Sequence, residues 1–248
     1  MLVGWLTAFL DIPAGRFDDA VRFWCAVTGS EASTRRGDRD QVATLLPPEG
    51  EPWLRVQRLR SGGPGMHLDL HAADRASLCA LAEELGATRR SVLDDLTVLA
   101  SPGGLRFCVV SGSESGRAAP VDWGNHHRSV ADQVCVDIPP SAYDHECAFW
   151  SALLERRLER SASREFLFLD RPAGQQLRIL LQRLDDEQPE HAHLDLASDD
   201  RDAEVRRVRD LGASQVRVTD DWTTLADPSG LEFCVTDRDP WTGDVAGG

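Results

Sequence analysis

The chain has 248 residues, of which 42% are hydrophobic, so it is long enough for two domains that each bury a core. Its formal net charge is −14 and all 27 of its basic residues are arginines that form no basic stripe, which argues against a nucleic-acid partner. No apolar run approaches the roughly 20 residues that span a bilayer, so we expect no membrane partner. The apolar first residues lack a basic region and a cleavage site, and the six cysteines lack CxxC spacing, which predicts reduced thiols and a cytoplasmic protein.

The first quarter of the chain changes from a strand pattern to a helix pattern and back. Residues 3–11 predict a strand, and apolar side chains at helical spacing then continue until Gly29, which suits a helix C-cap. Three short strands are predicted next, two of them separated by a Pro-Pro-Glu-Gly turn. They lie near residues 31–34, 41–46 and 53–59.

The same order begins again in the second quarter. Residues 66–71 predict a strand, Asp74 is placed to cap a helix, and Gly86 is placed to end it. Three strands are then predicted near residues 88–92, 97–100 and 105–110. The last two are joined by Ser101-Pro102-Gly103-Gly104, which fits a β-turn with Pro at its second position and Gly at its fourth. The first half is therefore predicted to contain two βαβββ modules.

The second half of the chain repeats the first with an offset of 126 positions. His67-Leu68-Asp69-Leu70, for example, falls on the identical residues 193–196. Between the two copies lies a segment rich in Ser, Gly and Pro, which is typical of a linker. We therefore predict two domains, at residues 1–115 and 129–248, joined by a linker at residues 116–128.

Short motifs mark the elements of this repeat. They are a Phe-Trp pair in the first helix of each copy, Leu-Gly-Ala at the end of the second helix, and Asp-Pro-Ser-Gly-Leu-Glu-Phe-Cys-Val at the last strand. Together they resemble the vicinal oxygen chelate superfamily, and more narrowly its glyoxalase-like or bleomycin-resistance-like branch. The resemblance implies an α+β fold of two tandem domains, each made of two βαβββ modules that form a curved open mixed sheet, with helices on its outer face and a cup for a small molecule. Because the two copies lie in one chain, their pairing predicts a pseudo-dimer without a second subunit, present as a monomer or a homodimer.

Two histidine–aspartate pairs are the candidate catalytic residues. His67 and Asp69 share one face of a predicted strand, as do His193 and Asp195 in the second copy, while the leucines between them face the other way. Because the leucines belong against helices, we expect the polar side chains on the concave face. Such a pair can act as general base and orienting group, and it can equally serve as a structural hydrogen-bond pair.

The resemblance also implies a test for a metal site. In the metal-dependent members of the superfamily a histidine occupies the position of His67 and His193, and a carboxylate stands in the last strand. Here that carboxylate is replaced by Cys108 and Cys234, and only Gln133 offers a ligand from the first strand of a copy. The candidate metal ligands are therefore His193 and Gln133, the missing carboxylate argues against a divalent metal, and the cofactor stays unknown.

Further side chains are predicted to contact a ligand in the cups. They are Gln57, Gln133, Gln182, Trp53, Trp222, Cys108 and Cys234. Two functions stay open at this point. One is a small-molecule-binding protein that binds or sequesters an apolar or aromatic metabolite or antibiotic, and the other is a lyase or isomerase that uses histidine–aspartate acid–base chemistry, with or without a metal. The second copy keeps more of the family pattern, because Ser101 replaces Asp227 in the first copy's turn, so we expect the more family-like site there.

Overall fold

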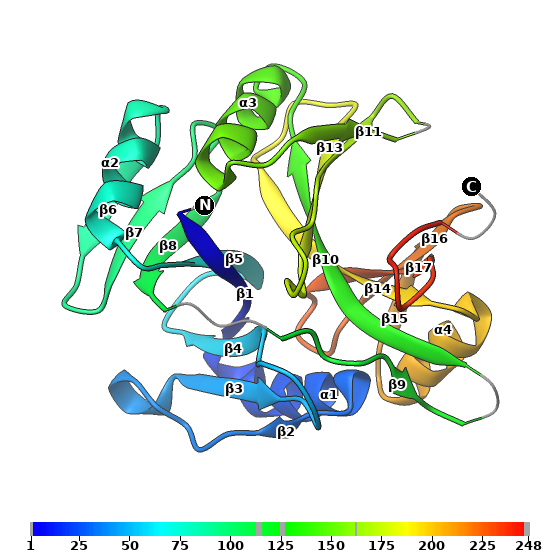
Figure 1. Cartoon of the computed structure of the whole chain (residues 1–248). Helices are drawn as coiled ribbons and strands as arrows, with labels where there is room; N and C mark the ends of the chain where they lie inside the picture. Colours follow the sequence, from blue (N-terminus) through cyan, green and yellow to red (C-terminus); the bar gives the residue numbers. More distant parts are fainter. Residues whose placement is uncertain (1, 113–115, 125–126, 162, 246–248) are drawn as a thin grey trace. The chain divides into compact units, whose positions relative to one another are not determined.

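The computed structural model describes residues 2–112, 116–124, 127–161 and 163–245, and Figure 1 shows its helices and strands. The elements of the first half, in chain order, are β1 (Val3–Pro13), α1 (Phe17–Thr28), β2 (Glu31–Ala32), β3 (Val42–Leu46), β4 (Leu54–Leu59), β5 (Gly65–Ala72), α2 (Arg75–Glu84), β6 (Thr88–Val92), β7 (Leu96–Ala100) and β8 (Arg106–Ser111). The strand and helix order predicted for the two modules of this half is confirmed.

The second half repeats this order after one additional strand. Its elements are β9 (Val121–Asp122), β10 (Arg128–Ile138), α3 (Tyr143–Leu154), β11 (Leu158–Arg160), β12 (Phe166–Leu169), β13 (Arg178–Arg183), β14 (His191–Ser198), α4 (Arg201–Asp210), β15 (Ser214–Val218), β16 (Trp222–Ala226) and β17 (Glu232–Asp237). The additional strand β9 lies in the segment expected to be a linker, and it pairs with the start of β10.

Each half contributes one open mixed sheet, as the α+β prediction requires. The first sheet has eight strands in the order β2-β3-β4-β1-β5-β8-β7-β6. The second has nine strands, eight of them in the matching order β11-β12-β13-β10-β14-β17-β16-β15, with β9 beside β10. The central pairs β5–β8 and β14–β17 are parallel, and this places Asp69 level with Cys108 and Asp195 level with Cys234.

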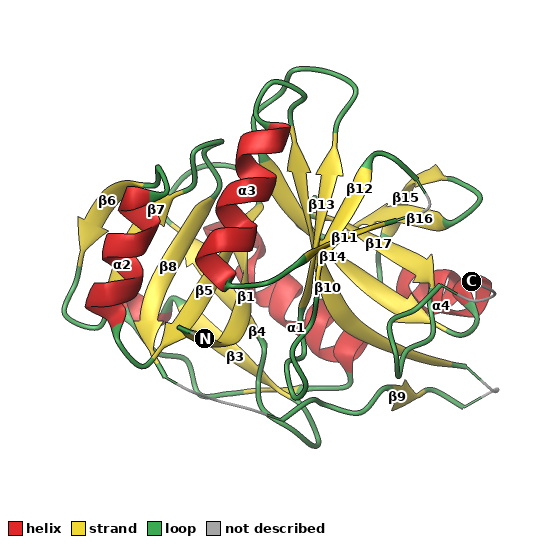
Figure 2. Ribbon diagram, turned by 45° about the horizontal axis from the view of Figure 1, so that its top comes forward, coloured by secondary structure: helices red, strands yellow, loops and turns green. Residues whose placement is uncertain are grey.

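The chain also divides into two compact units that do not follow the order of the sequence. The first unit comprises Met1–Phe9, Met66–Gly116 and Val134–Ala192, and the second comprises Leu10–Gly65, Arg117–Gln133 and His193–Gly248. Each unit therefore takes one helical module from each half: α2 and α3, which lie side by side in Figures 1 and 2, belong to the first unit. The helices α1 and α4 belong to the second unit.

Local sequence explains where the helices begin and end. Asp74 and Asp200 are the N-caps of α2 and α4, and their carboxylates accept hydrogen bonds from the backbone N–H groups of Ser77 at 3.1 Å and Ala203 at 2.9 Å. Gly29 follows α1 with a φ of +63°, in the left-handed region that glycine adopts at low cost. The predicted caps Asp74 and Gly29 are thus confirmed.

The core of the first unit packs helix α3 against strand β8. Phe107 of β8 contacts the rings of Phe149 and Trp150 in α3, with centroid separations of 6.0 Å and 5.4 Å. Leu68 and Leu70 of β5 are fully buried, as their alternation with the polar residues predicted. The Phe-Trp motif therefore joins a helix of one half to a strand of the other.

The core of the second unit repeats this arrangement with α1 and β17. Phe233 contacts Phe23 at 6.0 Å and Trp24 at 5.1 Å between ring centroids. Leu194 and Leu196 of β14 are buried as well. In the part of the chain that the structure describes, no helix is long and apolar enough to cross a membrane.

Candidate functional site

The second unit contains a polar cluster built on the adjacent strands β10, β14 and β17. His193 Nε2 lies 3.3 Å from Oδ1 of Asp195, which shares its face of β14. Gln133 of β10 donates from its amide nitrogen to the other carboxylate oxygen of Asp195 at 2.5 Å. Cys234 lies level with Asp195 on β17, and its Sγ is 3.5 Å from Oγ1 of Thr224. The structure thus brings together four of the predicted site residues, which we call the His193 cluster: Gln133, His193, Asp195 and Cys234.

Burial differs sharply within the His193 cluster. The Asp195 side chain is 4% exposed, whereas that of His193 is 16% exposed. Burial pushes the pKa of Asp195 upward, but the nearby imidazole of His193, the charge of Arg238 and the hydrogen bond from Gln133 together hold that pKa below its ordinary value. Asp195 is therefore an ionised buried acceptor, and the imidazole beside it is the part that solvent reaches.

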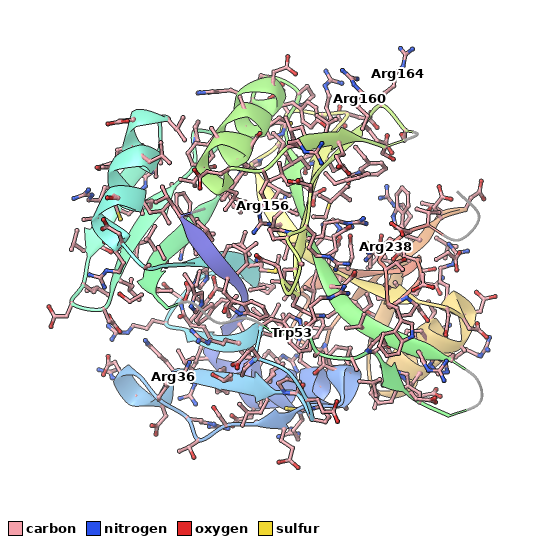
Figure 3. All side chains as sticks on the ribbon, in the orientation of Figure 1. Arg36, Trp53, Arg156, Arg160, Arg164 and Arg238 are labelled. Atoms are coloured by element: carbon pink, nitrogen blue, oxygen red, sulfur yellow. The ribbon has the colours of Figure 1, made fainter. Side chains whose placement is uncertain are left out.

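A buried ion pair supports this unit and was missed by the sequence analysis. The guanidinium of Arg238, labelled in Figure 3, donates from Nη2 to Asp132 Oδ1 at 2.7 Å and from Nη1 to Oδ2 at 3.2 Å. Both residues are buried. At an offset of 126, the first copy has Leu6 and Gly112 at these positions. A position-by-position comparison of the copies therefore shows that both charged residues are specific to the second copy.

The matching cluster of the first unit is more closed. His67 Nε2 lies 3.8 Å from Asp69 Oδ1, and the two side chains are only 6% and 4% exposed. The ring of Phe9 stacks on the imidazole of His67 with centroids 4.6 Å apart and planes inclined by 19°. In the second copy the residue at the position of Phe9 is Cys135, which has no ring to stack. The two copies therefore differ at the face of the imidazole.

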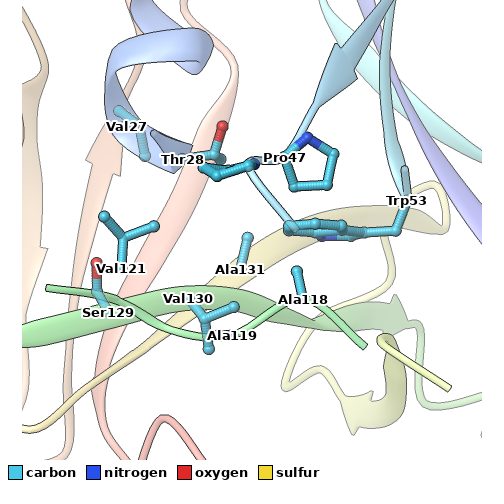
Figure 4. A pocket seen from close by; sticks show the side chains of 11 residues that line it. Val27, Thr28, Pro47, Trp53, Ala118, Ala119, Val121, Ser129, Val130 and Ala131 are labelled. Carbon is cyan, nitrogen blue, oxygen red and sulfur yellow. The ribbon is translucent and has the colours of Figure 1, made fainter. Parts of the chain in front are cut away.

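Four other predicted ligand contacts lie in varied surroundings. In the first unit, the Oε1 atom of Gln182 is 3.5 Å from the Sγ atom of Cys135. Gln57 and Trp222 are partly exposed on β4 and at the start of β16. Trp53 is buried in the second unit and lines a hollow with room for about one water molecule, shown in Figure 4. Besides Trp53, the hollow is lined by Val27, Thr28, Pro47, Pro48, Ala118, Ala119, Val121, Ser129, Val130 and Ala131.

The donor atoms decide which metal each cluster fits. His193, Asp195 and Cys234 each present one ligand atom within 4.8 Å of the others, and so do His67, Asp69 and Cys108 in the first unit. One imidazole, one carboxylate and one thiol suit a softer ion such as Zn²⁺, whereas Mn²⁺ favours carboxylate, carbonyl and water oxygens. In the second copy Gln133 already donates to the carboxylate. The donor set does not fit a hard metal ion such as Mn²⁺.

Comparisons with known proteins agree on the fold. A family model described as a glyoxalase-like domain matches residues 7–110 and again 133–236. Among solved structures, the Mn(II)-bound glyoxalase from Novosphingobium aromaticivorans is similar with a TM-score of 0.66 and 18% identity, over 95% of this chain and 82% of that one.

Two dioxygenases are similar as well. The 2,3-dioxygenase LapB from Pseudomonas sp. KL28 gives a TM-score of 0.60 and 14% identity, over 95% of this chain and 92% of that one. The 2,2',3-trihydroxybiphenyl 1,2-dioxygenase from Sphingomonas wittichii strain RW1 gives 0.62 and 13%, over 95% and 90%. No curated protein matches the chain. At these identities the likeness shows the fold alone.

Proposed function

Because the chain belongs to the glyoxalase-like family of the vicinal oxygen chelate superfamily, with one such domain in each half, we propose that it is a small-molecule-binding protein whose ligand site is the His193 cluster. The observation that carries the proposal is the difference between the copies. The imidazole of His193 is partly open to solvent above a buried acceptor, whereas that of His67 is stacked beneath Phe9.

The chemistry of the cluster favours a particular kind of ligand. Cys234 stands in the last strand, where the resemblance to metal-dependent members of the superfamily implies a carboxylate, and the cluster offers an imidazole to a ligand within otherwise buried surroundings. The ligand proposed for this site is an apolar or aromatic metabolite or antibiotic with one polar group that pairs with the imidazole. The net charge of −14 favours a small molecule over nucleic acid as the partner, and six free thiols favour a reducing compartment such as the cytoplasm.

Calorimetric titration with catechol, naphthol, quinoline and bleomycin tests the binding proposal. We expect at least one of these probes to bind, and His193→Gln to weaken that binding at least tenfold. His67→Gln is the matched control, because it makes the same substitution at the same position of the other copy and should leave binding unchanged. Failure of every probe to bind, or equal losses in both variants, contradicts the proposal.

A second candidate function rests on the contact between His193 and Asp195. An imidazole held 3.3 Å from an ionised carboxylate is arranged as a general base with its orienting group, as a lyase or isomerase needs to move a proton next to a carbonyl. Exchange of such a proton in deuterated water, followed by NMR on ketone and aldehyde probes, tests this function. It predicts exchange that His193→Gln abolishes and Asp195→Asn slows, and identical rates for all three proteins contradict it.

A further inference from the structure

Two glutamates of the first unit meet at the turn between β7 and β8. Glu146 of α3 is fully buried, and its Oε1 accepts a hydrogen bond from the backbone N–H of Gly103 at 2.5 Å. Its Oε2 accepts one from the indole N–H of Trp150 at 2.9 Å. Both carboxylate oxygens of Glu146 thus have hydrogen-bond donors.

Glu190, directly before β14, approaches the same turn from another segment. The hydroxyl of Ser101 donates to its Oε1 at 3.3 Å, while its Oε2 is buried without a hydrogen-bond donor. A Cβ added at Gly103 would lie 1.7 Å from that Oε2 and 3.0 Å from Cγ of Glu146, so both glutamates converge on the space that this glycine leaves. Neither glutamate has an arginine partner within the residues that the structure describes.

Two carboxylates in one buried space repel each other unless a proton lies between them. We propose that Glu146 and Glu190 share one proton at neutral pH and form an acid clasp, which ties the turn at residues 101–104 to α3 and loosens when that proton is lost. The clasp is a pH-sensitive device of the first unit. The proposed ligand site belongs to the second unit.

The raised pKa of Glu190 agrees with this geometry. Burial and, next, the charge of Glu146 raise the pKa of Glu190 to about 9. Cys147 of α3 is a further titratable group that faces the pair, and burial raises its own pKa to about 12, so it stays neutral. His145 lies against Gly86 at the end of α2. Hydrogen bonds from the Ser101 hydroxyl and the backbone N–H of Leu105 lower the pKa of Glu190, but burial and the charge of Glu146 outweigh them.

The second unit holds the equivalent turn without a second acid. There Asp227 occupies the position of Ser101, and its carboxylate accepts hydrogen bonds from the indole of Trp24 at 2.8 Å and from the backbone N–H of Leu231 at 3.0 Å. The positions of Glu146 and Glu190 are occupied by Ala20 and Pro64. A single carboxylate is therefore sufficient for the turn, and the clasp is specific to the first unit.

The test compares unfolding of the wild type and Glu190→Gln between pH 5 and pH 10, with Glu84→Gln, an exposed glutamate on α2, as the control. The folded pKa of Glu190 is raised above the unfolded value of 4.5. The contribution of the protonated Glu190 to the free energy of unfolding is therefore fully present below about pH 4.5 and is lost as pH rises toward about 9. Within that window we expect the wild-type unfolding constant to rise by up to about tenfold per pH unit more than that of Glu190→Gln. Glu84→Gln should follow the wild type.

A direct measurement keeps the proposal testable if Glu190→Gln does not fold. Carbon-13 NMR of the glutamate carboxyl groups in the wild type should show one group that titrates near pH 9, and Glu190→Pro, which carries the residue of the second copy, should lose that signal. Titration of all glutamates between about pH 3 and 6 overturns the proposal. So does stabilisation of the wild type by added Ca²⁺ that Glu190→Gln abolishes, because the pair would then share a cation instead of a proton.

Discussion

Removing Arg238 tests how the second unit tolerates its buried ion pair. Arg238→Met deletes the guanidinium that binds both carboxylate oxygens of Asp132, a side chain with no solvent exposure. An uncompensated buried carboxylate costs about 3–5 kcal/mol. For a protein of this size that loss lowers the Tm by roughly 6–20 °C.

Replacing both residues, Asp132→Leu with Arg238→Met, should recover most of this loss, because a buried pair and its hydrophobic replacement are about equal in stability. The leucine also matches Leu6, the residue at this position of the first copy.

Urea unfolding followed by tryptophan fluorescence measures both effects. We expect Asp132→Leu and Arg238→Met to couple by about 3 kcal/mol in a double-mutant cycle. The control is Arg128→Met, which removes an exposed partner of Asp122 and should cost less than about 1 kcal/mol. A double variant as unstable as Arg238→Met alone refutes the reasoning. The destabilisation would then come from lost packing of the arginine side chain and not from the unpaired buried carboxylate of Asp132.

Three further outcomes are expected. Trp24→Phe removes the indole donor to a buried turn carboxylate and should lower the free energy of unfolding by about 1.5–3 kcal/mol in urea. Gly103→Ser should destabilise the wild type by about 1–3 kcal/mol because its Cβ collides with Glu190, and it should cost much less in Glu190→Pro, whereas equal losses contradict the placement of that carboxyl group. The depressed pKa of Asp195 contributes stability above its unfolded pKa that is lost as pH falls, so His193→Gln should move acid unfolding, followed by circular dichroism, to higher pH, and an unchanged midpoint contradicts the contact.

The sequence predicts the elements of this fold well because its signals are local and occur twice. Alternation identifies β5 and β14, and Asp74 and Gly29 mark helix ends by backbone chemistry that needs no distant partner. The two-residue strand β9 has no periodicity to detect. The division into compact units could not be predicted, because it depends on Phe107 and Phe233 each packing on a helix of the other half, and the two Phe-Trp motifs are identical.

The candidate site is predictable in part for the same reason. Strand alternation predicts His193 and Asp195 on one face, and the resemblance to the superfamily points to Gln133 in the first strand of the copy; in the structure the three side chains are neighbours. The stacking of Phe9 on His67, which closes the first cluster, could not be predicted. In the sequence Phe9 is only one more apolar residue of a predicted buried strand. The partner of Arg238 lies 106 residues away, and only the fold brings such a pair together.

The most direct test of the proposed ligand site is NMR of the protein labelled with nitrogen-15 in its histidine side chains. It is titrated with whichever of the four probes binds best. The proposal predicts that the imidazole signals of His193 shift in proportion to occupancy while those of His67 stay in place. Shifts at His67 with none at His193 would contradict it and would assign binding to the copy in which Phe9 covers the ring.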